Sequence, residues 1–103
     1  MFVSARAGMG ELEREDRQPL ASCIGFGVEA VDGRVGTIET PLFPADRTVP
    51  DFLVVRVRNG PYTRTSVVPA ALVRKIDLDE RLVYVAARRA DVLRMPERLP
   101  VGR

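Results

Sequence analysis

Residues 51–58 read Asp-Phe-Leu-Val-Val-Arg-Val-Arg and form the most regularly alternating segment of the chain. Successive side chains of a β-strand point to opposite faces of its sheet, so Leu53, Val55 and Val57 share one face. The other face carries the alternate residues, which are Phe52, Val54, Arg56 and Arg58. We therefore expect a strand with one buried face and a second face that meets water at its arginine end.

Short β-branched segments continue on both sides of this strand, and turn residues such as Asn59-Gly60-Pro61 separate them. Asp32-Gly33 is a pair that tolerates the positive φ angles of a type I′ turn. Ile24–Val31 and Arg34–Thr40 are therefore predicted to pair as a hairpin. Within its second strand the apolar positions change parity around Gly36, which a β-bulge would explain by adding one residue and sharpening the twist.

The segment after the Asn59–Thr63 loop is predicted to return antiparallel to the strong strand. The register that this loop favours places Val57 opposite Thr65 and brings Arg58 opposite Arg64. Like charges placed directly opposite each other destabilise a sheet. An acid or an anionic partner is therefore needed nearby.

A turn and a final hairpin complete the predicted sheet. Pro69–Leu72 is expected to form a tight corner, because proline ends a ladder of backbone hydrogen bonds. Val73–Leu78 and Arg81–Ala86 are expected to pair around Asp79-Glu80. Ala87–Met95 has the apolar spacing of a short closing helix that a proline ends.

Together these segments predict an all-β fold, a small and highly bent antiparallel β-barrel of about six strands with a short C-terminal helical turn. The domain is expected over residues 23–96, with a C-terminal tail over 97–103. Residues 1–22 carry a dense block of charge and few large apolar side chains. We expect them to form a mobile charged arm, of which residues 1 to about 17 contribute little to stability.

Composition narrows the class of protein. The chain has 103 residues, of which 46% are hydrophobic, so it forms one domain with a single modest core. A net charge of +2 is too small to indicate a nucleic-acid binder by itself. The only cysteine is Cys23, which excludes an internal disulfide and favours a reducing cytoplasm. No segment has the length and hydropathy expected of a membrane span.

No pattern indicates catalysis. The chain has no histidine, and its two Gly-x-Gly pairs lack the third glycine of a dinucleotide site. Asp77, Asp79 and Glu80 fit a solvated turn better than a calcium loop. A buried and unreactive thiol is the expected state of Cys23, because no histidine can activate it. We therefore expect no enzymatic activity, no cofactor and no metal.

The order of these segments resembles the PRC-barrel family. The residues that carry the resemblance are 28–38 (VEAVDGRVGTI), 52–57 (FLVVRV), 67–69 (VVP), 72–73 (LV) and 83–85 (VYV). The similarity extends over about Ile24 to Pro96. It implies a compact β-barrel such as those in the cytoplasmic part of the photosynthetic reaction-centre H subunit and in a ribosome-maturation factor. It also implies binding and assembly, with no shared catalytic residue.

Five residues are candidates for contact with a partner: Arg56, Arg58, Arg64, Phe52 and Val54. The segment from residue 52 to residue 76 contains five cations and no acid, so its arginines either meet acids from the arm or from neighbouring strands, or bind an anionic partner.

The outward apolar residues favour a homodimer, and further apolar side chains adjoin them at Leu42, Phe43 and Tyr62. We expect a cytoplasmic, non-catalytic protein-interaction or assembly module that self-associates as a homodimer. The alternative is an RNA- or ribosome-associated maturation factor that uses the basic barrel face.

Overall fold

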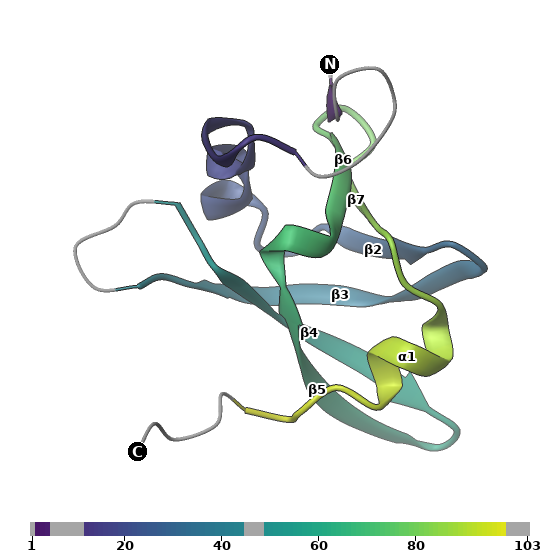
Figure 1. Cartoon of the computed structure of the whole chain (residues 1–103). Helices are drawn as coiled ribbons and strands as arrows, with labels where there is room; N and C mark the ends of the chain where they lie inside the picture. The colour runs from purple at the N-terminus through teal and green to yellow at the C-terminus, as the bar shows by residue number, and fades with distance from the viewer. Residues whose placement is uncertain (1, 5–11, 45–48, 99–103) are drawn as a thin grey trace.

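The computed structural model describes residues 2–4, 12–44 and 49–98. In these ranges one strongly bent sheet contains seven strands in the order β1-β6-β7-β2-β3-β4-β5 (Figure 1). The strands are β1 (Phe2–Ser4), β2 (Gly27–Ala30), β3 (Gly33–Leu42), β4 (Phe52–Asn59), β5 (Tyr62–Pro69), β6 (Val73–Asp77) and β7 (Leu82–Val85). The helical segments are η2 (Arg14–Ser22), η3 (Ala70–Leu72) and α1 (Arg89–Leu93). The predicted all-β, barrel-like class is confirmed.

One pairing departs from the expected antiparallel arrangement. β2 and β7 run parallel, with Val28 opposite Val83, whereas the other ladders are antiparallel. Strands joined by a tight turn must run antiparallel, but β2 and β7 are distant in the chain and no turn fixes their relative direction. The sheet is therefore mixed.

The hairpin of β2 and β3 forms as predicted, but its turn lies one residue earlier. Ala30 pairs with Gly33, so Val31 and Asp32 occupy the turn. Gly33 has a φ of 132°, whereas Asp32 does not have a positive φ. The predicted type I′ turn centred on Asp32-Gly33 is therefore wrong, because that turn needs positive φ at both central residues.

β3 contains two single-residue bulges. Val28 pairs with Gly36 and the next β2 residue pairs with Arg34, which leaves Val35 as the extra residue. A second shift against β4 leaves Glu39 as the extra residue. The predicted bulge at Gly36 is thus confirmed, with the extra residue immediately before it.

The bulges change which side chains of β3 are buried. Val35, Ile38 and Pro41 are buried at intervals of three residues, whereas an uninterrupted strand would bury every second residue. Gly36 sits between the bulges with its Cα close to β4. A Cβ built there would collide with the backbone carbonyl oxygen of Arg56. The bend of the sheet depends on this close approach.

β4 has the burial predicted from its alternation. Leu53, Val55 and Val57 are fully buried, whereas Arg56 and Arg58 are exposed.

Its register with β5 differs from the prediction by one residue. Asn59 pairs with Tyr62, so the loop contains only Gly60 and Pro61, and Gly60 has a φ of 65°. The shorter loop places Val57 opposite Arg64, and it places Arg58 opposite Thr63. A slip of one residue moves every β5 side chain to the other face, so the predicted pairing of Arg58 with Arg64 is wrong.

The segment before Cys23 contributes to the core. Leu12 and Leu20 are 2% and 0% exposed and belong to the same buried cluster as the inner face of β4. The 3₁₀ helix η2 contacts β6, and Figure 1 shows it above the sheet on the side away from α1. This burial corrects the expectation that residues 1–22 add little apolar contact.

The other end of the sheet is covered by the end of the chain. The predicted corner at η3, the hairpin of β6 and β7, and the closing helix α1 are all confirmed. Val92 of α1 is fully buried in the core, and α1 contacts β3 and β5. Beyond it, Val67 donates a backbone hydrogen bond to Pro96, and the hydroxyl of Thr65 donates to the carbonyl oxygen of Glu97. The beginning of the predicted tail therefore lies against β5.

Gly36→Ala tests the close approach of β3 and β4. We expect a loss of about 3 kcal/mol in the free energy of unfolding, because the new methyl group meets backbone rather than a movable side chain. Gly27→Ala is the matched control, since its Cβ would meet chiefly the flexible end of the Arg34 side chain. Urea unfolding followed by circular dichroism measures both variants. Equal losses of unfolding free energy in the two variants would show that position 36 accommodates a Cβ as well as position 27 does.

Leu20→Ala tests whether η2 is part of the folded domain. Removing a fully buried leucine side chain should lower the free energy of unfolding by about 2–5 kcal/mol. Ile24→Ala is the control, because this side chain is 58% exposed and should cost much less. Thermal unfolding of the two variants compares them. A Leu20→Ala variant that melts with the parent would restore the expectation of an unimportant arm.

Candidate functional site

The outer face of β4 holds four of the five predicted site residues. Phe52 and Val54 lie at its beginning, and Arg56 and Arg58 lie toward its end. Phe52 is flanked by Leu42 of β3 and by Pro69 of β5, and Val54 is flanked by Thr40 and Val67. We call the half-buried group of Leu42, Phe52, Val54 and Pro69 the apolar outer patch.

Two further apolar residues were predicted to adjoin this patch. Phe43 follows β3 directly and is 48% exposed. Tyr62 is 75% exposed but pairs with Asn59 at the far end of the hairpin. Its register also places it on the face opposite to Phe52. The sheet therefore separates Tyr62 from the patch.

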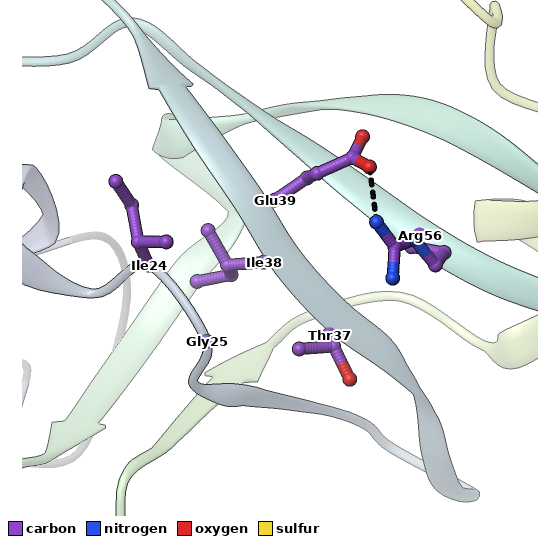
Figure 2. Close-up of a pocket in the computed structure, with 6 residues that line it drawn as sticks. All are labelled: Ile24, Gly25, Thr37, Ile38, Glu39 and Arg56. Carbon is purple, nitrogen blue, oxygen red and sulfur yellow. Dashed lines mark hydrogen bonds and ion pairs between the residues drawn. The ribbon is translucent and has the colours of Figure 1, made fainter.

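Arg56 forms an ion pair with Glu39, the extra residue of the second bulge (Figure 2). The sequence left open whether acids from the arm or from neighbouring strands balance these arginines. For Arg56, the acid comes from a neighbouring strand. Both side chains line a shallow pocket together with Ile24, Gly25, Thr37 and Ile38. Ile24 is 58% exposed at its rim. The carboxylate of Glu39 therefore balances the charge of Arg56.

Arg64 points to the other side of the sheet and acts structurally. Its guanidinium donates hydrogen bonds to the backbone carbonyl oxygens of Leu93 at 2.8 Å and Met95 at 2.6 Å. These carbonyls end α1, where the last turn has no intrahelical donors. Arg64 therefore holds the end of α1 against β5 and does not join Arg56 and Arg58.

Arg58 is exposed, and among the residues that the structure describes no hydrogen bond or ion pair holds its guanidinium. It lines a surface pocket with Arg34 and Arg89, two arginines that the sequence reasoning did not single out. Arg34 belongs to β3 and Arg89 begins α1, so their convergence depends on the three-dimensional fold. The only part of this pocket that the sequence indicated was the predicted turn at Asp32.

Cys23 is fully buried, as predicted, and its thiol donates a hydrogen bond to the carbonyl oxygen of Pro19 at 3.2 Å. Burial raises the pKa of this thiol from 9.0 to about 11, although the positive charge of Arg81 acts in the opposite direction. A thiol that stays protonated at neutral pH is a poor nucleophile. The environment of Cys23 is that of a core side chain.

The acidic turn after β6 is closed by its own backbone. Asp77 accepts a hydrogen bond from the backbone N–H of Glu80 at 2.9 Å. Across the described ranges, no three His, Cys, Asp or Glu side chains gather where they could hold a metal ion. The same ranges contain no helix that is long and apolar enough to cross a membrane.

Comparison with known proteins adds no assignment. No protein-family model matches the chain, and no curated protein sequence matches it significantly. The resemblance to the PRC-barrel family therefore stays a prediction from the residues that carry it.

The raised pKa of Cys23 predicts a pH dependence of stability. Folding favours the protonated thiol, so this stabilisation is complete below pH 9 and is lost as the pH rises from 9 toward about 11. Urea unfolding of the parent and of Cys23→Ala over this interval measures the effect. We expect the free energy of unfolding to fall more steeply for the parent. Parallel curves would show that the thiol does not titrate differently in the folded state.

Proposed function

We propose that this protein is a non-catalytic protein-interaction module that self-associates through the apolar outer patch. The observation that carries the proposal is the position of Phe52 and Val54, which lie side by side with Leu42 and Pro69 on the outer face of the sheet. An apolar patch on a sheet face is a common feature of protein interfaces. The resemblance to the PRC-barrel family points to the same class of function.

A second copy of the chain is the proposed occupant of the patch. A two-fold axis through Phe52 would place each patch against its equivalent, which is the commonest arrangement of a homodimer. Burying a fully exposed large apolar side chain gains about 1.5–3 kcal/mol, and the half-buried side chains of the patch would each contribute part of this. The Glu39–Arg56 ion pair lies beside Val54 and would supply a polar part of the rim.

The proposal of binding without catalysis is supported by the state of the reactive groups. The pKa of Cys23 is raised, and this shift opposes nucleophilic attack. Ser66 is fully buried, and its Oγ atom has no hydrogen-bond partner that could serve as a base. A buried cysteine also suits a protein of the reducing cytoplasm, which we propose as its location.

The alternative function in RNA or ribosome binding is less well supported. It relied on Arg56, Arg58 and Arg64 forming one basic face. Arg64 instead binds the end of α1, and Arg56 is paired with Glu39. Only Arg58 of the three offers an unengaged charge on that face, and a single cation gives little affinity for a polynucleotide.

Phe52→Glu tests self-association. We expect the parent to sediment as a dimer at micromolar concentration and the variant to sediment as a monomer, because the new carboxylates would be buried against apolar side chains. Moderate salt should leave the parent dimer intact, since the hydrophobic contribution is not screened by ions. Analytical ultracentrifugation measures both effects.

Tyr62→Glu is the matched control for this experiment. It introduces the same charge on an aromatic position of the neighbouring strand, but on the other face and far from the patch. The control should therefore remain dimeric. A monomeric parent would contradict self-association, and a dimeric Phe52→Glu variant would place the interface elsewhere.

A further inference from the structure

A second surface feature lies at the opposite end of β4. The turn between β2 and β3, the end of β4 and helix α1 meet around a concave site, and Figure 1 shows α1 beside this end of the sheet. The residues that define it are Asp32, Arg34, Val35, Arg58, Arg89 and Leu93. They come from four separate elements of the chain. The fold therefore gathers three guanidinium groups that are dispersed in the sequence.

The charges of this pocket are not balanced by the residues that the structure describes. The Nε atom of Arg34 lies 2.8 Å from Glu29, and the Nε atom of Arg89 lies 3.9 Å from Asp32. Asp32 also accepts a hydrogen bond from the backbone N–H of Arg89 at 2.8 Å. Each carboxylate is thus engaged by one arginine. Arg58 has no such partner among the described residues, which leaves one net positive charge at the pocket.

The lining of the pocket limits what could bind there. Val35, Ala90 and Leu93 give it an apolar part, so a ligand with a short aliphatic stem would fit beside the guanidinium groups. A single net positive charge matches one carboxylate better than a phosphate monoester, which carries nearly two negative charges. None of the lining side chains is aromatic, so the site lacks the aromatic platform on which proteins commonly stack a nucleobase.

We infer that this pocket binds a carboxylate side chain from an acidic segment of a partner protein, with Arg58 as its main contact. A guanidinium can bind both oxygens of a carboxylate through two parallel N–H donors. Arg34 and Arg89 add attraction from the sides while they remain paired with Glu29 and Asp32. The site would let one barrel recognise a glutamate or an aspartate that projects from a neighbouring protein.

This inference does not depend on the proposed dimer. Arg58 lies six residues along the strand from Phe52, which corresponds to about 20 Å of extended chain. A dimer formed through the apolar outer patch would leave the pocket open. Self-association is measured by sedimentation and carboxylate binding by ligand titration, so the failure of either proposal is recognised separately.

The test titrates the full chain, labelled with ¹⁵N, with a blocked hexaglutamate peptide at low and physiological salt. We expect saturable shifts of the backbone amides of Arg34, Arg58 and Arg89. Arg58→Ser should weaken binding by about 10-fold, because it removes a charge-assisted pair of hydrogen bonds. Arg58→Lys keeps the positive charge but lacks the planar guanidinium. Its affinity for hexaglutamate should lie between those of the parent and the serine variant. A blocked hexaserine peptide should cause no saturable shift.

Arg94→Ser is the matched control, because it removes the same charge from an exposed arginine that lies outside this pocket. It should change hexaglutamate affinity by less than about 3-fold. An equal loss in both serine variants would show diffuse charge attraction and overturn the inference. So would the absence of shifts at the pocket amides. Tighter binding of a single-stranded oligoribonucleotide at the same amides would also overturn it and identify a nucleic-acid site.

Discussion

The close contact between Gly36 and the backbone of Arg56 is the constraint on which the shape of the sheet depends. A side chain at position 36 would collide with that carbonyl oxygen and push β3 away from β4. The bulges at Val35 and Glu39 lie on either side of this point, and each shifts the register of β3 against a neighbouring strand. Because β3 pairs with both β2 and β4, these shifts set the register on both of its sides.

The same bulges determine which side chains of β3 lie at each of the two candidate surfaces. Glu39 is the extra residue of the second bulge, and from there it pairs with Arg56 on the outer face. Val35 is the extra residue of the first bulge and lines the cationic pocket beside Arg58. A regular β3 would present alternating residues and would place neither side chain in this way. The distortion of one strand thus shapes both candidate binding surfaces.

The two ends of β4 carry different kinds of surface on one rigid strand. Phe52 is the first residue of β4 and has apolar neighbours, whereas Arg58 lies near the end of β4 beside other arginines. Between them the inner face is fully buried, so both surfaces are held by the core rather than by loops. Such an arrangement suits a module that binds two neighbours at once. The apolar end would join a second copy, and the cationic end would meet an acidic partner.

The local pattern of the sequence was sufficient to predict strands β2 to β7, the last hairpin, the corner at η3 and the inner row of β4, whereas β1 was missed because residues 1–22 were expected to form an arm. It was also sufficient to place Phe52 and Val54 outward, because alternation depends only on neighbouring residues. The local pattern could not determine the register of β4 and β5, because Asn59-Gly60-Pro61 fits both a loop of two residues and a longer loop. That difference of one residue moved Arg64 from the predicted basic face to the end of α1.

Contacts between distant segments were decided by the tertiary structure alone. The parallel pairing of β2 and β7 and the burial of Leu12 and Leu20 join parts of the chain that no local pattern relates. The pocket of Arg34, Arg58 and Arg89 arises in the same way. By itself the sequence determined which segments are extended and which faces are apolar, because those properties follow from adjacent residues. Which charges lie together depended on the bulges of β3 and on the packing of α1, because both bring together residues that are distant in the sequence.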